Sequence, residues 1–215
     1  MERKKEIRKI LKIVIGLMIF SVGIYLGLIA NIGLVPWDSL TMGISNLASI
    51  SYGKINIAIS VSILIIDLLL KEKIGIGTIL DALLTGTFID ILYVIFPLKG
   101  PSNVLVGILY MTVGLFINSI GAYFCMSAGL SCGPRDTLLI AIGKRLPKLG
   151  IGYVDIIIKI ALIILSLIVK GPIGIGTLYG MVGTGIAMQI VFNIIKFEPR
   201  DVVHENIFDS IANFK

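Results

Sequence analysis

Long apolar runs constrain the fold of this chain more than any other feature of its sequence. They cover residues 10–32, 55–70, 74–96, 104–128, 151–169 and 173–195. Charged residues make up only 15% of the chain and hydrophobic residues 56%, whereas a soluble domain averages about 25% charged residues. An apolar helix of about 20 residues spans the hydrocarbon core of a bilayer. The sequence therefore predicts an all-α integral membrane protein whose main partner is the lipid bilayer.

The composition also excludes several classes of function. The net charge is +6, but the basic residues lie at the ends of the apolar runs, as orientation signals do, so no nucleic-acid partner is expected. The one histidine, His204, lies far in sequence from the two cysteines, Cys125 and Cys132. We expect no metal site, no cofactor and no Cys–His catalytic pair, and we do not expect an enzyme. The first apolar run continues without a cleavage site, so it is interpreted as a retained span.

Two short segments interrupt the pattern of long runs. Each opens with a Pro-x-Asp turn, at residues 36–38 and 134–136, and its apolar part covers only residues 39–50 or 137–142. As a helix, the longer of the two rises roughly 18 Å, less than the hydrocarbon thickness of about 30 Å. We therefore interpret both segments as re-entrant half-helices, which enter and leave the membrane on one side.

The two turns belong to an internal duplication. A shift of 98 residues places the first Pro-x-Asp turn on the second. A shift of 99 residues places the Ile-Gly-Ile-Gly-Thr block at 74–78 on the identical block at 173–177. The chain is thus expected to hold a first repeat, a second repeat and a cytoplasmic tail, at residues 1–97, 98–196 and 197–215.

The number of spans determines how the repeats are oriented. Each repeat holds three long runs, so six spans and two half-helices make two inverted repeats. With the N-terminus inside, fifteen of the 19 basic residues lie on the inner side and three on the outer side. Eight full spans with parallel repeats are the alternative, but they weaken this bias and require two very short spans. The positive-inside rule favours inverted repeats in the plasma membrane, with both termini cytoplasmic.

The Pro-Trp-Asp turn, the Pro-Arg-Asp turn and the two Ile-Gly-Ile-Gly-Thr blocks resemble the YczE/YyaS/YitT family of membrane proteins, and the YczE branch above all. The resemblance covers nearly the whole chain. The family pattern is Gly-x-Gly-Pro-Trp-Asp in the first half and Gly-Pro-Arg-Asp-Gly in the second; here Val35 replaces the second glycine and Thr137 the last. The resemblance implies a duplicated membrane protein, and it implies no particular activity or substrate.

Asp38 and Asp136 are the first candidates for a binding site. Both have a purely structural interpretation, because a carboxylate in the first turn of a helix is stabilised by the free N–H groups and the helix dipole. Alternatively, the two carboxylates bind a cation or exchange a proton at membrane depth. Trp37 and Arg135 hold the middle positions of the turns. Arg135 either pairs with one of the aspartates or holds an anionic group, or the two are an interfacial tryptophan and a loop arginine.

Further polar residues lie inside the long runs. Thr78 and Asp81 share one face of their predicted helix, and Thr177 marks the matching face in the second repeat. A carboxylate at the position of Asp81 is either a site residue or the partner of another buried polar group. Asp155 and Lys159 are four residues apart, so they can form an internal ion pair.

These features together favour a transporter or permease-like component for an unknown small solute or ion. Its site is expected between the two repeats, near Trp37, Asp38, Asp81, Arg135 and Asp136. The alternative is a non-transporting membrane protein that anchors a partner through the basic loop at residues 144–148 and the tail. A homo-oligomer or a protein partner is compatible with either function.

Overall fold

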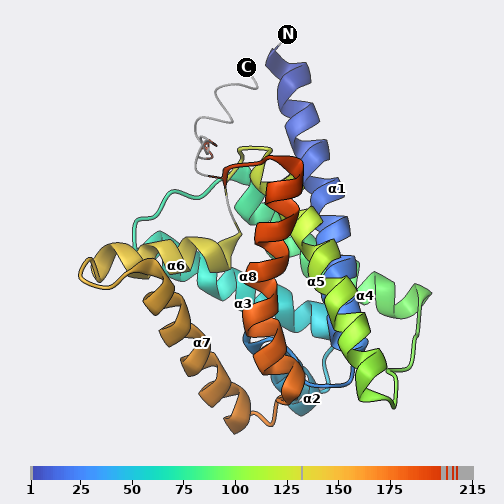
Figure 1. The fold of residues 1–215 in the computed structure, drawn as a ribbon. Helices are drawn as coiled ribbons and strands as arrows, with labels where there is room; N and C mark the ends of the chain where they lie inside the picture. The colour runs from blue at the N-terminus through green and yellow to red at the C-terminus, as the bar shows by residue number, and fades with distance from the viewer. Residues whose placement is uncertain (1, 132, 200–201, 203–204, 206, 208–215) are drawn as a thin grey trace.

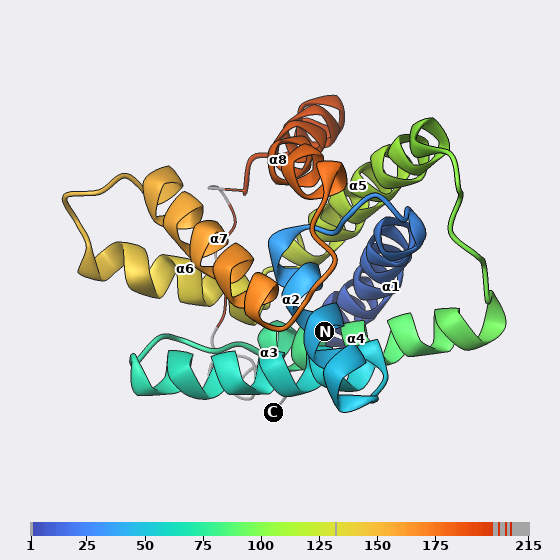
Figure 2. The ribbon, with the colours of Figure 1, turned by 90° about the horizontal axis from the view of Figure 1, so that it is seen from below.

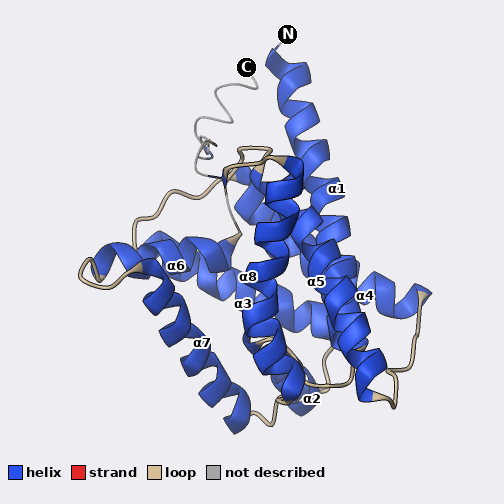
Figure 3. Ribbon diagram, in the orientation of Figure 1, coloured by secondary structure: helices blue, strands red, loops and turns tan. Residues whose placement is uncertain are grey.

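The computed structural model describes residues 2–131, 133–199, 202, 205 and 207. This part of the chain folds into eight α-helices without a strand (Figures 1 and 3). The helices are α1 (Glu2–Ile29), α2 (Pro36–Ala48), α3 (Tyr52–Leu69), α4 (Ile76–Ile95), α5 (Val104–Met126), α6 (Pro134–Arg145), α7 (Ile151–Ile168) and α8 (Ile175–Ile195). All except α2 and α6 are long and apolar enough to cross a membrane, which makes six candidate spans among the described residues. The predicted all-helical membrane class is confirmed.

The two short helices begin at the Pro-x-Asp turns. α2 starts at Pro36 and α6 at Pro134, in the first turn of each helix, where the missing N–H of proline costs no helical hydrogen bond. α6 continues to Arg145, beyond the predicted end of its apolar part at residue 142. Lys144 and Arg145 lower the hydropathy of this last turn, but they complement the negative end of the helix dipole and so extend the helix.

Three of the connections between helices meet at one end of the molecule, which we call the far end. There the main-chain N–H of Leu34 donates to the carbonyl oxygen of Pro172 at 3.0 Å. Asn31 Nδ2 donates to the carbonyl oxygen of Pro101 at 3.4 Å. The connections after α1, α4 and α7 therefore lie together, at the bottom of Figure 1.

The opposite end, which we call the terminal end, holds the beginning of α1 and the end of α8 (Figure 1). Lys12 Nζ of α1 donates there to the carbonyl oxygen of Ser127, which follows α5, at 3.2 Å. Lys144 Nζ, near the end of α6, lies 2.6 Å from Glu72 Oε2 in the connection after α3. α1, α5 and α8 run between these two ends, whereas α3 and α4 lie across them (Figures 1 and 2).

The helices pack as two groups of four. The long-helix group contains α1, α4, α5 and α8; α1 packs along α5, α4 lies against α1, and α8 lies against α5. Small residues allow the close approach of α1 and α5, since a Cβ at Gly23 would lie 2.6 Å from the carbonyl oxygen of Gly114. The turn group contains α2, α3, α6 and α7; α2 packs against α7 and α3 against α6. The two Pro-x-Asp turns thus open two helices of the same group.

Several local structures recur at positions 98 or 99 residues apart. The N–H of Gly77 donates to the Leu130 carbonyl oxygen at 2.9 Å, and the N–H of Gly176 donates to the Ile32 carbonyl oxygen at 2.8 Å. Positive φ angles recur in the same way: Asn31 (56°) with Gly129 (73°), Gly33 (101°) with Ser131 (83°), and Lys71 (59°) with Lys170 (56°). The connections before α4 and α8, and the segments after α1 and α5 that they contact, are therefore built alike.

Candidate functional site

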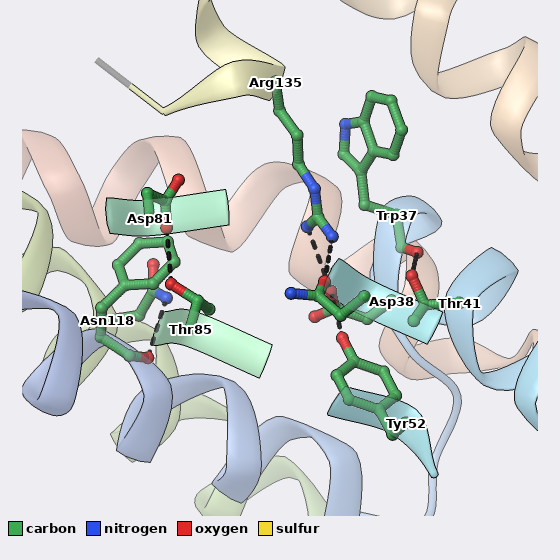
Figure 4. A network of polar contacts seen from close by, with 10 residues as sticks. Trp37, Asp38, Thr41, Tyr52, Asp81, Thr85, Asn118 and Arg135 are labelled. Carbon is green, nitrogen blue, oxygen red and sulfur yellow. Dashed lines mark hydrogen bonds and ion pairs between the residues drawn. The ribbon is translucent and has the colours of Figure 1, made fainter. Parts of the chain in front are cut away.

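Asp38 and Arg135 join the first turns of the two short helices (Figure 4). Arg135 Nη1 lies 3.4 Å from Asp38 Oδ1, and Arg135 Nη2 donates to Asn56 Oδ1 at 2.6 Å. The hydroxyl of Tyr52 donates to the same Asp38 oxygen at 2.9 Å. Asp38 is buried, so this pairing compensates a carboxylate that would otherwise be costly at this depth. Of the two aspartates considered for Arg135, the structure pairs it with Asp38.

Trp37 contacts the same arginine. The guanidinium carbon of Arg135 lies 5.1 Å from the centre of the Trp37 ring, within the range of a cation–π interaction. The two middle residues of the Pro-x-Asp turns therefore touch each other, and Arg135 is held on one side by carboxylate and amide oxygens and on the other by an aromatic face (Figure 4). These contacts within the chain fix the position of the Arg135 guanidinium group.

Asp136 differs from its counterpart in the first repeat. Its side chain is exposed into the cavities described below, whereas Asp38 is only 7% exposed. Within the described residues, the carboxylate of Asp136 has no hydrogen bond or ion pair. One of the two symmetry-related carboxylates is thus fully engaged, and the other is accessible to a ligand.

Two neighbouring cavities meet at Asp136. The larger has a volume of about 280 Å³ and lies between α1, α5 and α8 of the long-helix group and α2, α6 and α7 of the turn group. Its wall is largely apolar, with Met111, Leu115, Leu139 and Met188 among the lining residues. Asp38, Arg135, Asp136, Asp155 and Lys159 supply its charged side chains. Three carboxylates therefore face two cations in an apolar chamber, an arrangement typical of binding sites for small molecules.

The smaller cavity, of about 60 Å³, is lined by both Asp81 and Asp136. Thr85 Oγ1 donates to Asp81 Oδ1 at 2.5 Å (Figure 4). The two carboxylates approach each other across Gly133, since the Cβ position at this glycine lies close to Asp81 Oδ2 and 4.0 Å from Asp136 Oδ2. Two negative charges that line one small cavity repel each other, which favours the presence of a cation or a proton between them.

The remaining sequence candidates occupy other places. Lys159 Nζ lies 2.6 Å from Asp155 Oδ2, and this ion pair lines the larger cavity. Thr177 accepts a hydrogen bond from the N–H of Gly174 at 3.1 Å and so caps the beginning of α8. Thr78 is fully buried. Neither threonine lines either of the two cavities, and the described residues contain no cluster of His, Cys, Asp and Glu that could hold a metal ion.

Sequence reasoning missed Asp67, Asn56 and Tyr52. The carboxylate of Asp67 is fully buried in α3, and neither of its oxygens has a hydrogen-bond partner among the described residues. A single aspartate inside a long apolar run was the signal that could have identified it. Asn56 is also a polar residue of this run and corresponds to Asp155, whereas Tyr52 carried no such signal; only the fold brings the two side chains to Arg135 and Asp38.

Comparison with known proteins identifies the family of this chain. Residues 7–193 match the model of a family of unknown function, DUF6198, and the chain belongs to this family. It is 30% identical over 185 residues to the uncharacterised protein YyaS of Bacillus subtilis, covering 85% of this chain and 91% of the relative. It is 27% identical over 176 residues to the uncharacterised membrane protein YczE of the same organism, with 81% and 80% covered. The expected resemblance to YczE and YyaS is confirmed.

A third relative is an uncharacterised protein of Haemophilus influenzae. It is 27% identical to this chain over 180 residues, which cover 84% of this chain and 81% of the relative. No solved structure matches the chain. The family and its relatives therefore support the membrane class, while the function has to be argued from the site.

Proposed function

We propose that this member of the DUF6198 family is a transporter of a small, positively charged solute, with a binding site between two inverted repeats in the plasma membrane. The proposal rests on one observation above all: the carboxylate of Asp136 faces a largely apolar cavity and lacks a partner among the described residues. A charge at membrane depth that the fold leaves uncompensated is a candidate for binding the transported species.

The arrangement of the helices supports inverted repeats. The connections after α1, α4 and α7 share the far end, as expected if each half of the chain contains three spans that alternate in sense. The recurrence of the Gly77–Leu130 and Gly176–Ile32 hydrogen bonds at opposite ends fits a two-fold relation between the halves. Inverted repeats with short helices that meet near the middle of the membrane are typical of secondary transporters. The excess of basic residues on the terminal side supports an orientation with both termini in the cytoplasm.

The charges of the cavity favour a cationic solute. Arg135 is engaged by Asp38 and Asn56, and Lys159 is engaged by Asp155, so neither cation is available to an anion. Asp136 and Asp81 are the carboxylates that remain. The methionine and leucine side chains of the larger cavity suit the apolar part of such a solute. We assign the solute to the larger cavity and a proton or monovalent cation to the smaller one.

Charge movement in proteoliposomes tests this function. Solid-supported-membrane recordings with a panel of small amines, quaternary ammonium ions and amino acids should give a transient current with at least one cation. Asp136→Asn should abolish the current, while Glu198→Gln, at an exposed carboxylate outside both cavities, should retain it. A current that persists in Asp136→Asn, or no current with any member of the panel, would contradict the proposal.

A second candidate function is that of a membrane anchor for another protein. It is favoured by a charged cavity of about 370 Å³, which Lys71, Lys73 and Lys144 line together with Glu72 and Glu205. A protein that co-purifies with the wild-type chain and dissociates when these lysines are replaced by glutamine would support the anchor. Retention of the partner by the lysine variants would exclude it.

A further inference from the structure

α3 and α4 make the most intimate contact between the turn group and the long-helix group. The contact centres on two glycines, because a Cβ added to Gly53 of α3 would collide with the carbonyl oxygen of Gly86 in α4. The reverse also holds: a Cβ added to Gly86 would collide with the carbonyl oxygen of Gly53. Backbones approach this closely only where neither helix carries a side chain.

Asp90 fastens this contact. Its carboxylate oxygens accept one hydrogen bond from the N–H of Gly53 at 2.7 Å and another from Ser51 Oγ at 2.6 Å. Both donors belong to the first turn of α3, where the main-chain N–H groups have no helical partner. The negative charge of Asp90 therefore lies at the positive end of α3, which strengthens both hydrogen bonds.

The second half of the chain has corresponding residues, but α7 and α8 do not make this contact. Gly152 of α7 and Gly185 of α8 lie 99 residues after Gly53 and Gly86. In the described part of the chain, no atom beyond the adjoining backbone lies within 4 Å of a Cβ at either glycine. Gln189, which corresponds to Asp90, donates to Asn193 Oδ1 within its own helix at 3.0 Å. α7 and α8 are separated in Figure 2, and the larger cavity lies between them.

We infer that the structure is one of two states, and that in the other state α7 closes on α8 through Gly152 and Gly185 while α3 separates from α4. This inference rests on the inverted repeats of the proposed function, since two-fold related halves can exchange their conformations. In the second state Gln189 replaces Asp90 as the acceptor for the first turn of the neighbouring helix. The cavity then opens between α3 and α4.

The interactions within each group are compatible with this exchange. The Asp38–Arg135 pair lies within the turn group, and the contact of α1 with α5 lies within the long-helix group. A rotation of one group against the other leaves both intact. The connections that hold the beginnings of α4 and α8, with their Gly77–Leu130 and Gly176–Ile32 hydrogen bonds, are the natural hinges because they occupy equivalent places in the two halves.

Cysteine cross-linking tests the second state directly. In a chain without the native cysteines, reconstituted in nanodiscs, Gly152→Cys combined with Gly185→Cys should form a disulfide with copper phenanthroline. A pair shifted by two turns, Gly152→Cys with Leu178→Cys, provides the control and should not. Failure of the 152–185 pair to cross-link, or equal cross-linking of the control pair, would overturn the inference.

Distances between spin labels at equivalent positions of the two halves test whether one interface opens when the other closes. Labels at Tyr153 and Val182 report on α7 and α8, and labels at the equivalent Lys54 and Leu83 report on α3 and α4; all four side chains are exposed. The wild-type chain should show two distances for each pair. Gly152→Val, which fits the open space of this state, should remove the short 153–182 distance and the long 54–83 distance.

The reciprocal variant should give the reciprocal result. Gly53→Val should remove the short 54–83 distance and retain the short 153–182 distance. If this variant does not fold, the result for Gly152→Val alone tests the inference. A single distance for each pair that Gly152→Val leaves unchanged would overturn the inference. These distances need no solute, so a chain that exchanges states without moving any cation would contradict the proposed function and support this inference.

Discussion

Two pairs of helices occupy equivalent places in the halves of this protein: α3 with α4, and α7 with α8. In the first pair, Gly53 and Gly86 bring the backbones together and Asp90 fastens them. In the second pair, the equivalent glycines face open space, and the cavity with its charged side chains lies between the helices. The same small residues therefore allow close packing without imposing it, and only the first of the two equivalent interfaces is closed in this structure.

The turns at the centre extend the comparison. Asp38 is buried between Tyr52 and Arg135, while Asp136 faces the cavities. This difference follows from the middle residues, because Arg135 neutralises the aspartate of the other repeat and Trp37 cannot. The two repeats thus differ in charge, because the first supplies a buried, paired carboxylate and the second an accessible one.

The largest expected effect comes from removing the cation at the centre. Arg135→Ala leaves Asp38 without its charged partner, so we expect the free energy of unfolding in detergent to fall by about 2–5 kcal/mol. Trp37→Ala, at the equivalent position, should cost clearly less because Asp38 keeps its partner. Chemical denaturation measures both values. Equal losses in the free energy of unfolding would show that Arg135 is no more important to stability than Trp37.

A methyl group added at Gly53 and one added at the equivalent Gly152 should change the free energy of unfolding in opposite directions. Gly53→Ala places a Cβ against the carbonyl oxygen of Gly86, so we expect a loss of about 1–3 kcal/mol in the free energy of unfolding. Gly152→Ala meets open space and improves the helix propensity, so a gain of up to about 1 kcal/mol is expected. Unfolding monitored by circular dichroism measures both values, and a loss of similar size at Gly152 would remove the distinction between the interfaces.

The carboxylate that fastens α3 should matter more than its counterpart. Asp90→Ala removes two acceptors and leaves the N–H of Gly53 without its partner, which costs about 1–3 kcal/mol. Gln189→Ala, which loses a hydrogen bond on an exposed helix face, should change the free energy of unfolding by less than about 0.5 kcal/mol. The same denaturation experiment measures both values. A Gln189 variant as unstable as the Asp90 variant would contradict the special role of Asp90.

Asp67 is a position where we expect a substitution to give a small gain in stability. Its equivalent in the second half is Ser166, whose Oγ lies 2.6 Å from Ser39 Oγ. Asp67→Ser removes a buried carboxylate without a hydrogen-bond partner among the described residues, so we expect a gain of about 1 kcal/mol in the free energy of unfolding. A loss of stability would show that the carboxylate has a partner that the fold alone does not supply.

Much of the architecture follows from the length of the apolar runs. The six long helices and the two short ones were predicted because hydrophobic length and turn residues are local properties. For α6 only the apolar part was predicted, at residues 137–142, and the helix continues through the polar Lys144 and Arg145. The duplication was also visible, since identical residues recur at a fixed spacing.

The site was only partly predictable for a physical reason. The sequence places Asp38, Arg135 and Asp136 in matching turns, but the burial of one aspartate and the exposure of the other depend on contacts across the two halves. Thr177 was grouped with the binding residues by helical spacing, while the structure uses it to cap α8. The gap between α7 and α8 has no sequence signal, because Gly152 and Gly185 repeat the glycines of the closed pair.

The accessibility of two equivalent lysines tests whether the two halves of the chain have opposite orientations in the membrane. Lys71 and Lys170 lie 99 residues apart, follow α3 and α7, share the same positive φ and are both exposed. In intact cells that express cysteine-free protein with a single Lys71→Cys or Lys170→Cys change, a membrane-impermeant maleimide should label position 170 and leave position 71 unlabelled until the membrane is permeabilised. Labelling of both positions from the outside would contradict the inverted arrangement.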